Sequence, residues 1–515
     1  MAEKTNNKTI AKNTIFLYFR MMVTMVISLY TSRVILQILG VDDYGIYKSV
    51  GGIVGFLAFV NNALGTGSSR FLTYCLGEGN MEKLKRVFST TLTVHVLLAT
   101  IIAIIAETVG LWFLWHKLMI PADRLGAAVF TFHLSIITAF VTLTQVPYNA
   151  CIIAHEKMGV YAYVSIFDAV AKLLIVYLLL IGGDIDKLKL YAMLLCLLQV
   201  GIIIFYRIYC IHYFEETHFR FSIDKKIFHE IAGFSGWQLF ANGSIALNSQ
   251  GILILLNIFF APAVVAARAI SIQVNMAANH FVTNFQTAVN PQIVKLYAAK
   301  DYEGSRRLLL RTTRFSYYLM YLLALPICLV AQQLLQLWLG IVPEYAVIFL
   351  QIIIIQSLFQ VFDTSFYRAL YAKGQIRENA LISPTLGFIQ FPVVYLLFKM
   401  GCSPVALSWA SLITYMLLGL IIKPILVIKI VDYTWRDIFS VFLPCLKVTL
   451  ASLPLPLLFY FWLKNHDSIV FSFCAITIVS IISVICSSWF LGMDKPMRQK
   501  VVEMVRKKLI KNKMK

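Results

Sequence analysis

The stretch IVFSFCAITIVSIISVICSSWFLG, residues 469–492, holds no charged side chain over 24 consecutive positions. At a rise of about 1.5 Å per residue, a helix of this length exceeds the hydrocarbon core of a membrane, which is roughly 30 Å thick. Stretches of this kind are typical of membrane-spanning segments rather than of water-soluble domains. The segment therefore predicts a transmembrane helix.

Segments of the same kind recur along the rest of the chain. The chain has 515 residues, of which 59% are hydrophobic and 14% charged, which leaves too little polar surface for a globule in water. We therefore expect an all-α polytopic membrane protein with about fourteen transmembrane helices. The other thirteen segments begin near Thr14, Ser49, Val87, Ala128, Val160, Leu190, Ile231, Val264, Phe315, Ala346, Ala380, Val405 and Val441.

The basic residues are distributed unequally between the two sides. With the amino terminus inside, about 31 of the 45 Lys and Arg lie in cytoplasmic segments and about 7 in external loops. This asymmetry predicts a multi-pass protein of a bacterial-type inner membrane with both termini cytoplasmic and with Asp42, Trp115 and Lys187 external. The net charge of +20 does not indicate a nucleic-acid partner, because the basic residues are not gathered among polar or aromatic base readers.

The nine cysteines lack CxxC or other metal-ligand spacing, and most fall inside apolar segments. Their pattern predicts neither a disulfide framework nor a metal site. We expect no cofactor.

The two halves of the chain resemble each other. A shift of 223 residues lays Tyr74, Glu78, Thr90 and Trp115 on Tyr297, Asp301, Thr313 and Trp338. These matches indicate two six-helix lobes in parallel orientation. Two such lobes predict a cavity at the membrane midplane that opens to either side.

The repeat gives a division into five parts. Residues 1–218 form the first lobe, 219–230 a cytoplasmic amphipathic connector, 231–430 the second lobe, 431–492 helices 13 and 14, and 493–515 a basic tail. The final helix pair either adds lipid-facing surface for a long-tailed substrate or only packs against the lobe. The tail is either a helix on the anionic inner leaflet or a disordered basic segment.

Polar residues form stripes along the first, second, seventh and eighth segments, at 100° per residue. Because a polar sector is costly in lipid, we expect these four helices to enclose a wet cavity. The alternative is that polar side chains join helices. The stripes are Arg20, Thr24, Thr31; Asn62, Thr66, Ser69, Thr73; Gln238, Asn242, Ser249; and Arg268, Ser271, Asn275, Asn279, Gln286, Asn290. Both interpretations apply to a stripe on the fourth segment: Thr131, Ser135, Thr138, Thr142, Gln145.

Arginines inside the membrane indicate the kind of substrate. A central Arg costs roughly 2.5–3.5 kcal/mol on insertion scales, and a guanidinium binds phosphate oxygens through two parallel hydrogen bonds. Arg20, Arg33 and Arg268 therefore predict an anionic, phosphate-bearing substrate. The predicted substrate-binding residues are Arg20, Arg33, Arg70, Arg268, Asn62, Gln238, Asn242, Asn275 and Asn279.

Three acids inside the membrane bear on that prediction, because the alternative is that the arginines pair with buried acids. Asp168 has Lys172 four residues later, which is expected to neutralise it. Glu107 and Asp363 have no partner at helical spacing and are candidates for binding a coupling cation. The alternative is that each is a satisfied structural acid.

A series of short motifs runs along the chain: Arg33, Leu39, Gly40, Tyr44, Gly45, Ile46, Tyr47, Gly65, Ser69, Arg70, Gly77 and residues 291–307. In these motifs the chain resembles the polysaccharide-export branch of the multidrug/oligosaccharidyl-lipid/polysaccharide (MOP) exporter superfamily, which includes Wzx-type flippases. The resemblance implies a MATE-like fold of two six-helix lobes and translocation of undecaprenyl-diphosphate-linked oligosaccharide from the cytoplasmic to the periplasmic leaflet. Such a flippase serves surface polysaccharide biosynthesis, for O-antigen of lipopolysaccharide or for capsule, and is not an enzyme.

The chain departs from the family pattern at the start of the eighth segment. Ala266 and Ala267 precede Arg268 where a Gly-Tyr pair is common in the family, so the role of Arg268 rests on its charge and its place in the polar stripe and not on the resemblance. The implied partners are the lipid-linked oligosaccharide, inner-membrane phospholipids and polysaccharide polymerase machinery.

Two other functions fit the sequence less well. A multidrug exporter of the same superfamily should have an aromatic, acidic cavity for organic cations. A membrane oligosaccharide polymerase or ligase needs a large external loop with catalytic Arg or His, and the external loops here are short.

Overall fold

The computed structural model describes residues 2–57, 80–155, 157–181, 185–218, 246–375, 377–463 and 468–493, with a few single residues between them. Every regular element in these ranges is helical. The prediction of an all-α fold is confirmed.

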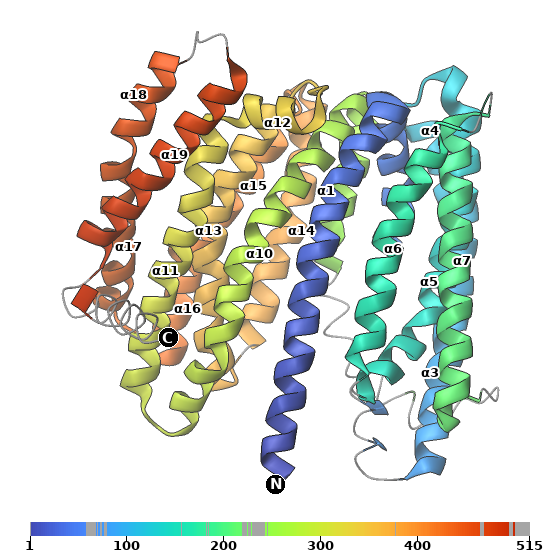
Figure 1. Ribbon diagram of the computed structural model, residues 1–515, viewed down its shortest axis with the longest axis horizontal. Helices are drawn as coiled ribbons and strands as arrows, with labels where there is room; N and C mark the ends of the chain where they lie inside the picture. The colour runs from blue at the N-terminus through green and yellow to red at the C-terminus, as the bar shows by residue number, and fades with distance from the viewer. Residues whose placement is uncertain are drawn as a thin grey trace, which may run out of the picture. The chain divides into compact units, whose positions relative to one another are not determined.

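The chain folds into two compact units, and the first comprises residues 1–270, 339–344 and 384–404. Within it α5 packs along α7, α3 and α1, while α6 packs along α1 (Figure 1). Its elements are α1 (Ala2–Leu57), α3 (Met81–Ile105), η1 (Ala106–Gly110), α4 (Leu111–Lys117), η2 (Ala122–Arg124), α5 (Leu125–Ala154), α6 (Met158–Leu178), α7 (Lys187–Tyr213), η3 (Glu215–Thr217), η4 (Leu247–Gly251) and α9 (Ile252–Phe259).

The second unit comprises residues 271–338, 345–383 and 405–515. Helices α10 (Pro262–Ala298) and α14 (Arg377–Lys399) contribute to both units. In the second unit α11 packs against α13, α17 and α19 (Figure 1). Its other elements are α11 (Tyr302–Leu329), α12 (Ala331–Leu339), α13 (Ala346–Lys373), α15 (Ala406–Leu417), η5 (Leu418–Ile422), α16 (Lys423–Val431), α17 (Trp435–Ser452), α18 (Pro454–Leu463), α19 (Ile469–Ser487) and η6 (Ser488–Gly492).

Within the described ranges, nine helices are long and apolar enough to cross a membrane, or ten if α11 and α12, bent by 80°, form one span. The chain is a multi-pass membrane protein. Helix α10 is not among the nine, and it carries the stripe of Arg, Asn and Gln. In the described ranges, three π turns, η1, η4 and η5, interrupt helices, and a fourth, η6, ends α19.

Helix α1 consists of two helices joined at Gly40, whose φ of 82° and ψ of 173° leave the helical region. A positive φ of this size favours glycine, which has no Cβ. The sequence predicts an external loop over residues 40–48, and this expectation is wrong beyond Gly40. Residues 41–57 are helical, so the turn into the second segment is a single residue long.

Helices α3 and α11, which correspond in the predicted repeat, begin in similar ways. The Asn80 side chain accepts the N–H of Lys83 at 3.0 Å, and the Asp301 side chain accepts the N–H of Gly304 at 2.8 Å. A side-chain oxygen at this position satisfies one of the free N–H groups at the helix start. The matched threonines, Thr90 and Thr313, are both fully buried. The lobe boundaries themselves stay a prediction.

Gly45 marks a close approach between α1 and the start of α10. A Cβ at this position would collide with the backbone carbonyl and ring of Pro262. We expect Gly45→Ala to lower the free energy of unfolding by about 1–3 kcal/mol, because overpacking forces the backbones apart. Thermal unfolding of the purified protein in detergent measures the effect.

Gly51 on the same helix provides the control, because a Cβ there would meet no atom within 4 Å. Gly51→Ala is expected to leave stability unchanged or to raise it by about 0.5–1 kcal/mol, the usual cost of a helix-interior glycine. Equal losses in the two variants would contradict the assignment of Gly45 to backbone packing.

Candidate functional site

Several predicted site residues fall outside the structure. Asn62, Arg70, Gln238 and Asn242 lie outside the described residues, and Arg20 belongs to the part of α1 whose side chains are not described. Their substrate-binding roles stay predictions.

The first unit contains a cavity of about 490 Å³ between α1, α6 and α7. Thr24 and Thr31, which the sequence places on a cavity-facing stripe, both line it. Further polar side chains reach it from α6, a helix for which the sequence predicts no cavity role. The polar lining residues are Thr24, Ser28, Thr31, Ser32, Tyr47, Lys48, Ser165, Asp168, Lys172 and Tyr191.

Among the described lining residues, the charged groups are two ammonium groups and one carboxylate. Lys172 Nζ lies 2.7 Å from Asp168 Oδ2, which confirms the predicted pair. Lys48 Nζ lies over the rings of Tyr44 and Tyr47, at 5.2 Å and 5.7 Å from their centroids. Such contacts stabilise a cation without neutralising it. The lining therefore carries more positive than negative charge.

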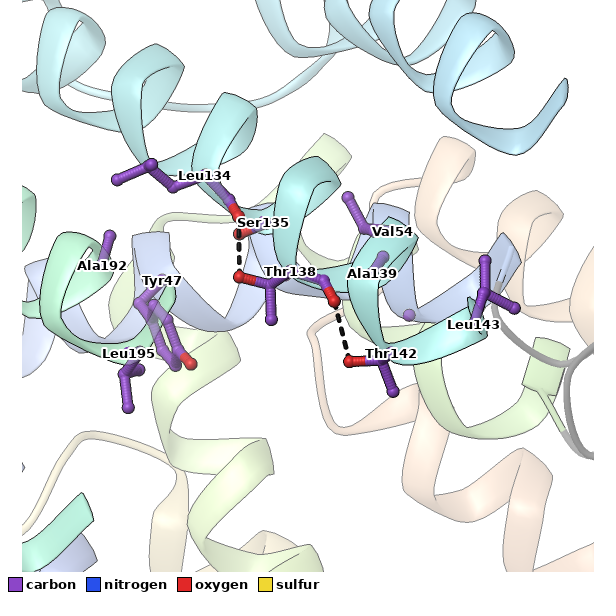
Figure 2. A pocket seen from close by; sticks show the side chains of 12 residues that line it. Tyr47, Val54, Leu134, Ser135, Thr138, Ala139, Thr142, Leu143, Ala192 and Leu195 are labelled. Atoms are coloured by element: carbon purple, nitrogen blue, oxygen red, sulfur yellow. Dashed lines mark hydrogen bonds between the residues drawn. The ribbon is translucent and has the colours of Figure 1, made fainter. Parts of the chain in front are cut away.

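A second cavity of about 240 Å³ lies next to the first, since Tyr47 and Leu195 line both (Figure 2). Figure 2 shows the Thr138 and Thr142 hydroxyls bonded along their own helix, to the carbonyl oxygens of Leu134 at 2.8 Å and Thr138 at 2.7 Å. Ser135 bonds in the same way to Thr131 at 2.8 Å.

The two interpretations of the fourth predicted segment, now α5, thus apply to different residues. Ser135, Thr138 and Thr142 face the second cavity. Gln145 instead joins helices, because its Oε1 accepts Gln199 Nε2 of α7 at 3.1 Å.

The amide stripe of α10 forms hydrogen bonds with α13. Ser357 Oγ donates to Asn275 Oδ1 at 2.6 Å, and Asn279 Nδ2 lies 3.1 Å from Ser357 Oγ. Gln286 Nε2 donates to Ser365 Oγ at 2.9 Å. These side chains therefore form hydrogen bonds between two helices, as expected if the polar stripe joins helices. Binding of substrate by Asn275 and Asn279 stays a prediction.

Two of the predicted substrate-binding arginines have described side chains, and these are shielded to different extents. Arg268 is 4% exposed on α10, whereas Arg33 is half-buried on α1. Burial of a guanidinium is expensive in a protein interior and in lipid, which is why such a residue is a candidate for function.

Both predicted cation-binding acids have basic partners from other helices. Asp363 Oδ1 lies 2.9 Å from Lys423 Nζ, and Lys423 is 2% exposed. The same ammonium bonds to Asn379 Oδ1. Glu107 Oε1 lies 3.0 Å from His133 Nδ1. These contacts favour the structural-acid alternative, while binding of a coupling cation stays a prediction.

Sequence reasoning missed the contribution of α6 to the first cavity. Ser165, Asp168 and Lys172 follow the spacing i, i+3, i+7, which puts them on one helix face. That spacing was a usable signal. From the sequence, Asp168 and Lys172 are assigned only to mutual neutralisation.

At the external end predicted from charge, Arg124 joins three parts of the first unit. Its Nε donates to Asp43 Oδ1 at 2.8 Å and its Nη1 to Asp186 Oδ2 at 2.7 Å. Burial alone would raise the pKa of the Asp186 carboxyl, but hydrogen bonds from Arg124 and from the backbone N–H groups of Lys189 and Leu188 outweigh it and hold that pKa below its usual value.

No protein-family model matches the chain, and no curated protein matches it. Solved structures do. An inward-closed structure of the lipid II flippase MurJ has a TM-score of 0.69 and 11% identity, covering 93% of this chain and 98% of that chain. An inward-facing multidrug resistance MATE family transporter of the MOP superfamily has a TM-score of 0.67 and 13% identity, covering 80% of this chain and 98% of that chain.

A MOP superfamily transporter from Pyrococcus furiosus has a TM-score of 0.59 and 14% identity, covering 83% of this chain and 97% of that chain. At these identities the likeness concerns the fold. The chain therefore has the MATE-like fold that the solved MOP superfamily transporters and the lipid II flippase share.

Proposed function

We propose that the protein is a flippase that moves undecaprenyl-diphosphate-linked oligosaccharide from the cytoplasmic to the periplasmic leaflet of the inner membrane by alternating access, for O-antigen or capsule synthesis. The observation that carries the proposal is a hydroxyl-lined cavity with excess ammonium charge inside a membrane-spanning unit. Hydroxyls suit a sugar, and fixed cations suit a diphosphate.

The charged residues would act on the diphosphate. Arg20, Arg33 and Arg268, supported by Arg70, neutralise it as it leaves the headgroup region. Lys48 and Lys172, in the same unit, add positive charge to the lining of the first cavity. With the cytoplasm negative, outward movement of an anion is downhill by roughly 2.3 kcal/mol per charge per 100 mV.

The lipid tail would stay in the bilayer beside α17 to α19. Helix α17 buries one face, with Ile438, Val441 and Cys445, and exposes apolar residues on the other, among them Leu443 and Leu450. Thr449 on α17 bonds to the hydroxyl of Tyr317 at 2.9 Å, which fixes the helix against α11. The final part of the chain, α17 to α19, thus packs against α11 and also exposes apolar surface. These contacts fit both alternatives for the predicted helices 13 and 14, packing against the lobe and contact with a lipid tail.

A multidrug exporter is the second candidate, since such transporters share the fold. Its expected acidic cavity finds no support in the described acids, because Asp168, Asp363 and Glu107 each have a basic partner. The fold match to the lipid flippase also extends over more of this chain, 93% against 80%.

Reconstituted vesicles separate the candidates. A polyprenyl-diphosphate oligosaccharide is placed in the inner leaflet, and its arrival outside is read with a membrane-impermeant lectin. Protein-dependent arrival, absent from empty vesicles and not inhibited by lipophilic cations, is the expected result. Uptake of lipophilic cations without lipid movement would support the exporter instead. In the source organism, removal of the gene should cause the lipid-linked oligosaccharide to accumulate on the inner leaflet.

The predicted topology is testable with single cysteines. Lys187→Cys, exposed at the start of α7, should react in intact cells with a membrane-impermeant maleimide, measured as labelling above that of the parent. Glu82→Cys, exposed in the first turn of α3, should react only after the membrane is permeabilised. Labelling of Glu82→Cys but not Lys187→Cys in intact cells would show the opposite topology and would refute the proposed direction of transport.

A further inference from the structure

Three side chains of the kinds that ligate transition metals meet in the first unit, outside both cavities. The Sγ of Cys151, a ring nitrogen of His155 and a carboxylate oxygen of Glu216 all lie within 4.8 Å of one another. Cys151 Sγ is 3.1 Å from Glu216 Oε1, and His155 Nε2 is 2.6 Å from the same oxygen.

The fold, rather than the local sequence, brings these groups together. Cys151 and His155 are four residues apart at the end of α5, so they share a helix face. Glu216 lies in η3, directly after α7, and α7 packs along α5. An ion pair of 2.7 Å also joins Lys85 of α3 to Glu215 of the same short segment.

Burial and charge favour a bound cation at this point. Glu216 is 2% and Cys151 1% exposed. A buried carboxylate needs a compensating charge, and in the described part of the chain its hydrogen bonds come from a thiol and an imidazole. A divalent ion bound by a thiolate, a neutral imidazole and a carboxylate would leave the site with no net charge.

We propose that Cys151, His155 and Glu216 form a Zn²⁺ site that ties the end of α5 to the segment after α7. Thiolate, imidazole and carboxylate are the ligands that Zn²⁺ takes in proteins, at bond lengths of about 2.0–2.3 Å. Tetrahedral bonds of that length place ligand atoms about 3.5 Å apart, so displacements of about 1 Å from the present positions admit the ion.

The geometry also provides access and orientation. His155 is 24% exposed on its side chain, which opens the site to solvent and leaves the fourth coordination position to water. Its ring stacks on Phe214 with centroids 4.1 Å apart and planes 12° apart, which fixes the direction of Nε2. Binding transfers the Cys151 thiol proton to solvent as the sulfur–metal bond forms.

This site is independent of the proposed transport function, and metal binding tests it directly. Chelator-treated protein in detergent is titrated with Co²⁺, and the thiolate-to-cobalt charge-transfer band and the d–d bands are recorded. Wild-type protein should bind about one equivalent and should exchange it for Zn²⁺. Zn²⁺ should also raise the unfolding temperature, because it binds the folded state.

The variants Cys151→Ser and Glu216→Gln should lose the charge-transfer band or lower Co²⁺ affinity by at least the roughly 10–100-fold that loss of an outer-shell partner costs. His155→Asn, at the more exposed ligand, keeps the test valid if a core variant fails to fold. Cys210→Ser is the matched control. Cys210 is buried in the same hydrophobic core as Cys151, but its thiol donates to the Tyr148 carbonyl oxygen at 3.8 Å.

Two outcomes would overturn the proposal. One is a wild-type protein that binds no Co²⁺ or Zn²⁺ at micromolar free metal, which would make the cluster a hydrogen-bonded clasp. The other is an equal spectrum in wild type and all three ligand variants, which would assign binding to other cysteines.

Discussion

Lys423→Met is expected to destabilise the protein by about 3–5 kcal/mol, since it leaves the Asp363 carboxylate in the interior of the second unit without its cation. The ammonium lies 2.9 Å from that carboxylate, is 2% exposed, and also bonds to Asn379. Asp363→Asn should have a comparable effect, because it leaves the buried ammonium without a compensating negative charge. Thermal unfolding in detergent and the amount of protein in the membrane measure both.

The double variant Lys423→Met/Asp363→Leu should recover most of the lost stability, because replacing both members of a buried pair by apolar groups is often neutral. Lys399→Met, at the exposed end of α14, is the control and should change little. Additive losses in the double variant would contradict a direct pair. Transport by the double variant then tests Asp363 as a cation-binding residue, and unchanged ion dependence would exclude that role.

Arg268→Ala is expected to lower lipid-linked oligosaccharide transport at least about tenfold, since a hydrogen bond to a charged group contributes about 1.5–3 kcal/mol. Arg268 is 4% exposed, so its charge is held inside the protein rather than in water. The double variant Arg20→Ala/Arg268→Ala should abolish export. Surface glycan in a deletion strain, complemented at matched membrane levels, is the measurement.

Arg268→Lys is the matched variant, which keeps the charge but lacks the two-pronged geometry, so it should retain partial transport. An unfolding temperature close to that of the wild type separates a loss of binding from a loss of folding. Full export by the Arg20→Ala/Arg268→Ala variant would refute the anion-binding mechanism while leaving the flippase proposal open.

Much of the fold follows from the sequence, because a membrane requires long apolar helices and few other structures satisfy the backbone in lipid. The same requirement locates most helices, such as α13, which begins at Ala346 as predicted. The break at Gly40 is also visible, although the helix resumes at once and not after a loop. Local pairs are predictable too, as Asp168 with Lys172 shows.

Side-chain contacts between different helices cannot be predicted from the periodicity of the sequence. Periodicity places Asn275 and Asn279 on one face of α10, but it does not identify Ser357 of α13 as their partner. Lys423 lies 60 positions after Asp363, and Glu216 lies 65 positions after Cys151. Contacts of that separation depend on which helices pack together, and one sequence holds no direct signal of it.

The π turn η5, residues Leu418–Ile422, sits directly before Lys423. A π turn closes its hydrogen bonds over five residues instead of four, so it stores one surplus residue in the helix. The wider turn absorbs that residue locally, so α15 and α16 keep the relative rotation that an uninterrupted α-helix would give them. The chain can shorten by one residue inside η5, which becomes an ordinary α turn, without moving Lys423 out of line with Asp363. Loss of one residue from α15, with η5 intact, would instead rotate the Lys423 ammonium by about 100° around the helix axis, away from Asp363.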